Sequence, residues 1–200
     1  MSYCDGLIKQ GIQPNCDNPI TSGIEQNGVI MNRGDIDFSK IVYDGDRKNV
    51  IKTLALKQGA KAYPIYVPSK NPFSGTTTTM EETNTRNNFT NNVGFIILDN
   101  DPDVCENIID SLANGEFVMI YENRYKNLNK ETNKGDSSFQ IVGFHQGLKA
   151  TTLENDKWSE DTMGGWNVVL TESGVPLSGL FIYNTDLATT REMIDSLMAA

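Results

Sequence analysis

Residues 93–121 constrain the fold more than any other part of the chain, because they combine a buried strand, a capped helix and a second strand. The apolar runs at 93–98 and 117–121 have the length and composition of strands buried in a sheet. The run at 117–121 is continuously apolar, which is typical of a central strand. Between the two runs, Asp101 stands where it can cap a helix over residues 102–113. This order predicts a β-rich fold with one helix packed on the sheet.

The predicted helix has a single apolar stripe and therefore one buried face. Cys105 belongs to this stripe, so we expect it to be a small buried hydrophobe and not an activated thiol. The sequence Asn114-Gly115 ends the helix. The stripe consists of Val104, Cys105, Ile108, Ile109 and Leu112.

Further strands are expected on both sides of this unit. In residues 61–68 apolar side chains alternate, and Pro64 and Pro68 cannot donate hydrogen bonds to a neighbouring strand. We therefore expect this strand at a sheet edge or with a bulge. Residues 126–137 and 155–165 are expected to be polar connections. The other predicted strands are 28–32, 38–43, 50–56, 139–148, 166–171 and 179–183.

The two ends of the chain differ from its middle. Residues 1–27 are rich in Gly, Asn and Pro and are predicted to form an irregular N-terminal arm. Residues 28–183 are predicted to form a single β-rich domain, which suits a chain of 200 residues. Residues 184–200 are predicted to form a C-terminal helix, with Thr189 and Glu192 at the spacing of a capping box.

Residues 69–92 are the most biased segment in composition. Threonine fills positions 76–79, which gives high β propensity but little apolar surface to bury. A hairpin arm of this kind needs a neighbouring element to hold it, so we expect a second copy of the chain to complete its backbone pairing. A single chain with this segment folded onto its own body would contradict that expectation. The candidate interface residues are Thr77, Thr79, Glu81, Glu82 and Thr83.

The charge of the chain argues against a surface that grips nucleic acid. The formal net charge is -9 and the pI is about 4.6, whereas phosphate binding needs clustered Lys and Arg. An acidic surface suits either a channel that nucleic acid passes without sticking or ordinary solubility. No apolar run approaches the ~20 residues of a membrane helix, and residues 1–13 lack a basic-then-apolar pattern, so we expect no leader. We expect a protein made in the cytoplasm that has no membrane partner.

Reactive side chains are sparse. His145 is the only histidine, and no serine or cysteine around it has the setting of a nucleophile. A hydrolase that uses His145 as base is therefore the weaker interpretation, and a histidine on a strand near a turn is the stronger one. Cys4 and Cys16 leave a disulfide open, because spacing alone does not show one. We predict no enzymatic activity, no catalytic residues, no cofactor and no metal.

Several short motifs have simpler structural explanations. The alternating acids Asp99, Asp101 and Asp103 lack the glycine and glutamate of an EF-hand, so helix capping explains them better. The tripeptide at 33–35 reads as a turn, and the glycosylation pattern at 88–90 needs a secretion signal to act. Gly164-Gly165 lacks the strand-to-helix setting of a phosphate cradle. The aromatic residues Trp158, Trp166 and Tyr125 are candidates for stacking on a sugar.

The order of these parts resembles the tail tube proteins of tailed bacteriophages, particularly those that infect Bacteroides-type hosts. The resemblance covers about residues 28–183 and rests on four parts: the strand at 63–68 that leads into the Thr/Glu-rich arm, the strand at 95–98 with its Asp-capped helix, the sequences at 114–123 and 142–148, and the acidic loop before residues 164–170. The N-terminal arm and the C-terminal helix depart from shorter members of the family.

The resemblance implies an antiparallel β-sandwich or barrel with a flanking helix, in a mainly β (α+β) fold. It implies a homo-oligomeric ring, most simply a hexamer, that stacks into a tube in the virion tail and is assembled in the host cytoplasm. Other tail proteins would be partners, and DNA would pass without specific binding, with Glu81 and Glu82 as candidates for the bore. The alternatives are another neck or tail component on this fold, or a stand-alone carbohydrate-binding module.

Overall fold

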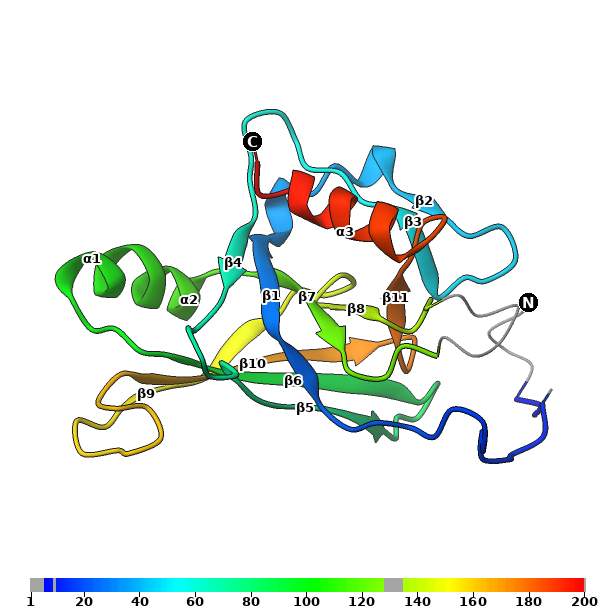
Figure 1. The fold of residues 1–200 in the computed structure, drawn as a ribbon, viewed down its shortest axis with the longest axis horizontal. Coiled ribbons are helices and arrows are strands. Elements are labelled where there is room, and N and C mark those ends of the chain that lie inside the picture. The colour runs from blue at the N-terminus through cyan, green and yellow to red at the C-terminus, as the bar shows by residue number, and fades with distance from the viewer. Residues whose placement is uncertain (1–5, 9, 128–134, 200) are drawn as a thin grey trace.

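The structure is a computed structural model that describes residues 6–8, 10–127 and 135–199. Eleven strands and a few helices make up this part of the chain (Figure 1). The strands are β1 (Ile24–Asn32), β2 (Val42–Tyr43), β3 (Val50–Thr53), β4 (Tyr63–Ile65), β5 (Phe73–Glu81), β6 (Asn88–Ile97), β7 (Phe117–Asn123), β8 (Phe139–Val142), β9 (Lys149–Asn155), β10 (Trp166–Val175) and β11 (Leu180–Ile182). The α-helices are α1 (Pro102–Val104), α2 (Asp110–Asn114) and α3 (Leu187–Ser196).

The strands form two sheets that pack face to face. The larger sheet has the order β2-β3-β11-β8-β7-β1-β4, and the smaller sheet has the order β5-β6-β10-β9. Each sheet ends in two edge strands, so the described residues form an open sandwich and no closed barrel. The predicted mainly β sandwich, with one flanking helix and a C-terminal helix, is confirmed. One pair, β11 with β3, is parallel, so the larger sheet is mixed and the expectation of a purely antiparallel fold is wrong there.

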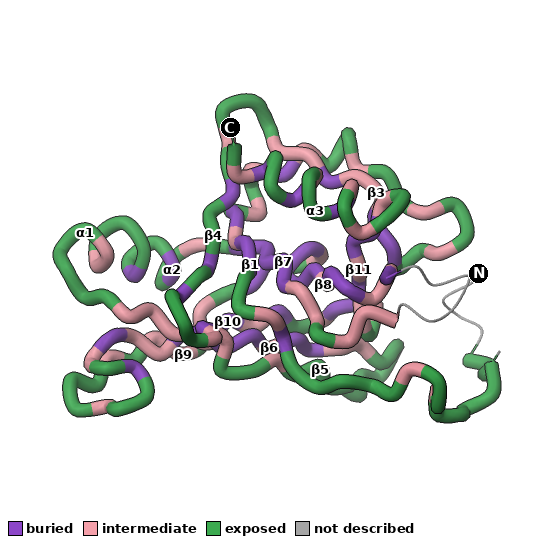
Figure 2. Tube along the Cα trace, in the orientation of Figure 1, coloured by how far each residue is buried: buried purple, intermediate pink, exposed green. Residues whose placement is uncertain are grey.

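Two apolar clusters lie on the two faces of the larger sheet, and both are visible as buried segments in Figure 2. The first lies between this sheet and α3 and includes Val118, Ile120 and Ile194. The second lies between the two sheets and includes Met119 and Phe95. Alternate residues of β7 therefore enter different clusters, which explains why its sequence is continuously apolar and confirms it as a central strand.

The flanking helix runs from Pro102 to Asn114 and contains one wide turn. The Asp101 side chain accepts the Val104 backbone N–H at 2.7 Å, which confirms the predicted cap. Residues Cys105–Ile109 form a π-helical turn between α1 and α2. A π turn shifts the phase of the residues that follow it. Ile108, predicted to be buried, is accordingly exposed, and Cys105 is only half-buried.

The C-terminal helix α3 is confirmed, but its cap is not the predicted one. Asp186 is the N-cap residue, and its side chain accepts the Thr189 backbone N–H at 2.8 Å. The capping box expected from Thr189 and Glu192 is therefore wrong. Asp186 satisfies the first turn because its short carboxylate precedes the helix directly. The helix then buries Ile194 against the larger sheet.

Several predicted strand boundaries are corrected. β1 begins at Ile24, inside the segment expected to be irregular. The strand expected at 38–43 is a 3-10 turn, Phe38–Lys40, followed by the two-residue β2. β9 was not predicted, because its sequence, Lys-Ala-Thr-Thr-Leu-Glu-Asn, carries too little apolar surface to signal a strand. The predicted edge position of the strand with Pro64 is confirmed, since β4 ends the larger sheet.

Candidate assembly interface

The outer side of β5 is the longest open strand edge in the described part of the chain. β5 pairs with β6 over residues 73–81 and is the last strand of its sheet. The edge strands of the larger sheet have only two and three residues, and β9 lies beside α2. Strand edges in natural proteins are usually short or guarded by Lys or Pro, and β5 contains neither residue. Its backbone is therefore available to a further strand.

The pairing of β5 with β6 corrects one expectation. We expected residues 69–92 to find no backbone partner within their own chain, and the structure folds this segment onto its own sheet. The unpaired ribbon is therefore wrong as an argument for self-association. What remains is the outer edge of β5 alone, together with its exposed faces, which Figure 2 shows in green.

The predicted interface residues all lie on the exposed surface of this hairpin. Thr77, Thr79 and Glu81 occupy alternate positions of β5 and therefore share the face turned away from the larger sheet. Glu82 and Thr83 lie in the turn between β5 and β6. The structure thus brings three of the five onto one face and places the other two at the tip of the hairpin.

Polar side chains link all four strands of the smaller sheet on that outer face. Asn92 donates to Thr77 Oγ1 at 3.2 Å, and Thr171 Oγ1 donates to Asn92 Oδ1 at 2.7 Å. The hydroxyls of Thr171 and Thr151 lie 2.9 Å apart. Cross-strand pairs of this type stabilise a sheet modestly. They give β5 side-chain contacts that do not depend on apolar burial.

The inner face of the smaller sheet contains a buried carboxylate that was not among the predicted site residues. Glu172 on β10 is 1% exposed. Its oxygens accept the backbone N–H groups of Gly143, His145 and Gln146 at 2.8, 2.9 and 2.8 Å. These bonds compensate for the burial of the charge. The signal in the sequence was Glu172 in phase with Val168 and Leu170, which makes it face the core.

A chain of polar contacts joins this carboxylate to the β5 edge. Asn91 on β6 donates to Glu172 Oε2 at 3.4 Å, and Thr78 on β5 donates to Asn91 Oδ1 at 2.7 Å. The loop at residues 143–146, which donates to Glu172, is also held by Arg33. The Arg33 Nη2 donates to the His145 carbonyl at 2.8 Å. Residues Arg33–Asp35 form a 3-10 turn, which confirms the turn predicted there, and this turn supports the loop.

His145 has the surroundings of a structural residue. Burial lowers the pKa of its imidazole, and Arg33 lowers it further while the Glu172 carboxylate opposes the shift. Its Nε2 is buried and has no hydrogen-bond partner among the described residues. Cys105 lies on the flanking helix, where its Sγ is 3.8 Å from Asn100 Oδ1. The nucleophile–base pair of a cysteine hydrolase is therefore not assembled from these two residues.

An open groove of about 820 Å³ lies beside the start of β5. Its walls are the chain that enters β1, the end of β7 and the first residues of β5. Phe73, Tyr125 and Phe181 contribute aromatic side chains, and Arg124 is the one charged residue in its lining. Its size falls in the range of ligand pockets, and its walls are partly apolar.

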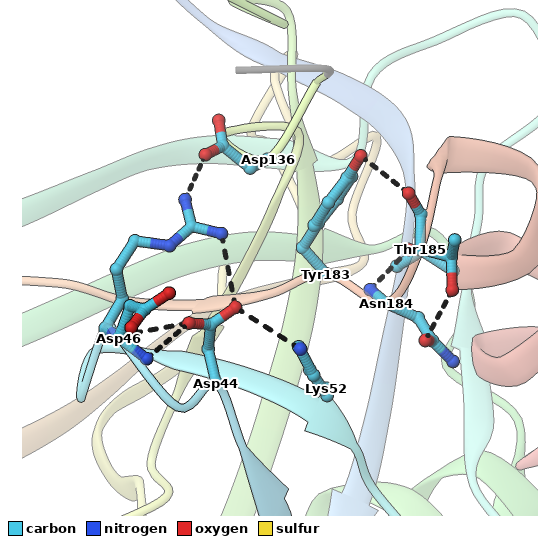
Figure 3. Close-up of polar contacts among 9 residues, drawn as sticks. Asp44, Asp46, Lys52, Asp136, Tyr183, Asn184 and Thr185 are labelled. Carbon is cyan, nitrogen blue, oxygen red and sulfur yellow. Dashed lines mark hydrogen bonds and ion pairs between the residues drawn. The ribbon is translucent and has the colours of Figure 1, made fainter. Parts of the chain in front are cut away.

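A charged cluster holds the turn after β2 against the chain that enters β8 (Figure 3). Arg47 forms ion pairs with Asp136 and, at 3.5 Å, with Asp44. Asp44 also lies 3.7 Å from Lys52 Nζ. Burial is the main cause that raises the pKa of Tyr183, whose hydroxyl donates to the Thr185 carbonyl at 3.1 Å. Every member of this cluster has a partner, so we interpret it as structural.

The three aromatic residues considered for sugar binding do not share a surface. Trp158 lies in the β9–β10 loop, Tyr125 follows β7, and Trp166 packs against the inner cluster. The Trp166 indole N–H donates to Asn100 Oδ1 at 2.9 Å. Trp158 is 93% exposed. The structure therefore leaves Trp158 as the one freely accessible candidate of the three.

The remaining sequence motifs also find structural explanations. Asp99 Oδ1 accepts the backbone N–H groups of Asn100 and Asp101 at 2.6 and 3.2 Å, so this acid also serves the helix start. The pattern at 88–90 forms the beginning of β6. Cys16 is exposed, and Cys4 lies outside the described residues. The disulfide considered between them therefore also falls outside the described part of the chain.

Comparison with known protein families, curated proteins and solved structures finds no match. Among the described residues, no cluster of His, Cys, Asp and Glu side chains has the composition of a metal site. The helices in that part of the chain are all too short or too polar to cross a membrane.

Proposed function

We propose that this chain is a structural subunit of a bacteriophage virion, and specifically a tail tube protein whose rings stack into a conduit for the genome. The observation that carries the proposal is the nine-residue open edge of β5, which contains neither Lys nor Pro, two residues that commonly guard an edge. A second copy can add a strand there and continue the sheet from one subunit to the next.

The form of this contact favours a ring or a filament. We propose that the β5 edge meets a different surface of the neighbouring copy, because β5 paired with β5 would close as a dimer and not as a ring. Contacts of that type close into a ring when the rotation between copies is a simple fraction of a circle. Rings of this kind, most simply hexamers, would stack through their exposed end surfaces.

The charge of the chain agrees with a conduit, and in the described residues Cys105 and His145 are not assembled as a catalytic pair. The net charge of -9 opposes DNA binding and favours passage without adhesion. Glu81 and Glu82 lie exposed at the end of the hairpin and are the acids we propose for the bore. We propose no enzymatic role, cofactor or metal, and the sites of action are the virion tail and, during assembly, the host cytoplasm.

Electron microscopy of the purified chain tests this proposal. Negative-stain images at increasing protein concentration are expected to show rings or tubes, and light scattering should show a mass that rises with concentration. A protein that stays monomeric at every concentration would overturn the proposal. Another neck or tail role on the same fold would give rings that do not stack.

A hairpin replacement locates the contact. β5 residues are exposed or half-exposed, so the hairpin adds little to the core. A direct deletion of residues 74–87 would join Phe73 to Asn88, although Phe73 pairs with Phe95, seven residues along β6 and about 23 Å away. Replacing residues 74–87 with a Gly/Ser linker of equal length avoids that strain. The variant is expected to fold and to remain monomeric.

A carbohydrate-binding module is the second candidate, favoured by the exposed Trp158 side chain. In that case monomeric protein would bind glycans with a shift in tryptophan fluorescence, and Trp158→Ala would abolish the shift. Glycan binding by a protein that never assembles would favour this candidate over the virion role.

A further inference from the structure

The β9–β10 loop, residues 156–165, presents two large apolar side chains to solvent. Trp158 is 93% exposed and Met163 is 77% exposed. Both side chains are largely accessible to solvent. A Trp that becomes buried at a protein contact typically contributes more binding free energy than most other residues. The loop lies at one end of the long axis in Figure 1, beyond the ends of β9 and β10.

Hydrogen bonds fix the shape of this loop. The Asn155 side chain donates to the carbonyls of Gly164 and Gly165 at 2.9 and 2.7 Å. Asp156 Oδ1 accepts the Trp158 backbone N–H at 2.9 Å. Lys70 Nζ adds a bond of 3.0 Å to the Asp161 carbonyl. A loop whose backbone is already ordered loses little conformational entropy on binding. These bonds therefore favour a contact made through Trp158.

The open groove beside β5 has the opposite character. It holds about 820 Å³ and is lined by the aromatic side chains of Phe73, Tyr125 and Phe181. The chain that enters β1 forms one wall, and Figure 1 shows this chain leading away from the β9–β10 loop, toward the other end of the molecule. The loop and the groove share no residue, because residues 156–165 are absent from the groove lining.

The charges of the two surfaces are complementary. The loop carries Asp156, Glu160 and Asp161 against Lys157, which gives three negative charges and one positive charge. The groove lining carries Arg124 and no acidic residue. In the described part of the chain no acidic side chain pairs with Arg124. Arg124 is therefore a positive charge without an acidic partner among the described residues, in a protein of net charge -9. Opposite charges orient two molecules as they approach each other, so Arg124 favours the approach of the acidic loop.

We infer that the β9–β10 loop of one copy inserts Trp158 into the β5-side groove of a second copy. The inference rests on the proposed function for its partner, because it takes a second copy as the occupant of the groove. It adds a second contact to the β5 edge, formed by two surfaces of the chain that share no residue. A contact between two different surfaces is heterologous when only one of the pair is used by each neighbour, and we propose that form because it propagates from copy to copy.

Cross-linking tests the contact directly. The background has its three cysteines replaced, with Cys105→Ala on the helix. One variant then carries Lys157→Cys beside the Trp158 anchor, and a second carries Ser74→Cys in the groove lining. A short bis-maleimide is expected to link the two variants when they are mixed. The matched control carries Ser111→Cys, at an exposed serine on α2, in place of Ser74→Cys. Mixed with the Lys157→Cys variant, it should cross-link only at background level.

Two substitutions show whether the link depends on the proposed contact. Trp158→Ala in the Lys157→Cys chain should reduce cross-linking and weaken self-association by about 30-fold or more, the range of a contact hot spot. Tyr66→Ala, which removes another exposed aromatic outside the groove, should leave both unchanged. A link that persists without Trp158 would overturn the inference.

A charge exchange provides an independent test. Arg124→Glu should slow assembly, and Arg124→Glu combined with Glu160→Arg should restore it. Tubes that form normally in the Trp158→Ala variant would refute this contact and leave the tail tube proposal standing. Protein that never self-associates, in any variant, would refute both. Glycan-induced fluorescence changes in that monomer would assign Trp158 to a sugar instead.

Discussion

Glu172 and Gly143 meet inside the sandwich, where Glu172 Oε2 accepts the Gly143 backbone N–H at 2.8 Å. Gly143 follows β8 of the larger sheet and Glu172 lies on β10 of the smaller sheet, so this bond ties the loop after β8 to β10. Gly143 has a positive φ of 83°, and a Cβ there would collide with the Phe117 carbonyl. The loop therefore needs both the glycine and the carboxylate to hold its shape.

Glu172→Gln is expected to lower the free energy of unfolding by about 3 kcal/mol. The substitution replaces one acceptor oxygen with an NH2 donor, which then faces backbone N–H donors. Urea unfolding monitored by circular dichroism measures this change. Glu154→Gln on β9 removes an exposed carboxylate and is the matched control, with an expected change below about 0.5 kcal/mol. Equal effects of the two substitutions would contradict the role assigned to Glu172.

His145 should make stability depend on pH. Burial lowers the pKa of its imidazole below the ordinary value of 6.5, so the unfolded chain binds a proton more readily than the folded chain. Stability from this residue is therefore present above pH 6.5 and is lost as the pH falls through 6.5 toward the lower folded pKa. The difference between the free energies of unfolding at pH 5 and pH 7.5 should be smaller in His145→Gln than in the wild type.

The titration can also be observed directly. The chain has one histidine, so a single imidazole proton signal reports its protonation by NMR. A midpoint at or above 6.5 in the folded protein would show that burial does not govern this residue.

Gly28→Ala is expected to cost about 1–3 kcal/mol, because the added methyl group would overlap the Phe73 ring from the other sheet. Phe73→Leu should recover part of the loss when the two changes are combined, which a double-mutant cycle measures. Gly34→Ala has open space around the added methyl and is the control. Simple additivity of the Gly28 and Phe73 changes would indicate that the two residues are not in contact.

Thr79→Lys should weaken self-association by about 10-fold or more, since a lysine on an edge strand opposes the addition of a further strand. Sedimentation velocity measures the association, and circular dichroism checks that the fold is retained. Ser111→Lys adds the same charge on α2, away from the strand edges, and should have little effect. Identical behaviour of the two variants would exclude β5 as the contact edge.

Local signals in the sequence predicted local structure well. The helix start at Asp101 and the central position of β7 each follow from a few neighbouring residues, and both are confirmed. The π turn at Cys105–Ile109 is not encoded in such a pattern, because periodicity alone assumes a regular helix. The exposure of Ile108 is the direct result.

Long-range features were not accessible from the sequence. Glu172 finds its partners 26 to 29 residues away, in a loop whose position depends on both sheets. β9 owes its strand conformation to the pairing with β10 and not to its own composition. The groove and its arginine arise where three separate segments meet. The exposed threonine face, in contrast, followed from the repeated residues at 76–79.

The four consecutive threonines of β5 have a consequence for accuracy in assembly. A strand laid along identical side chains can slide by two residues and still present the same face, so the repeat itself does not fix an alignment. The distinctive marks lie at the two ends, with an irregularity between Phe73 and Gly75 at one end and Glu81 at the other. If a second copy adds a strand to β5 as proposed, its alignment would be set at the two ends, because only there would a shifted strand meet a different charge or a bend.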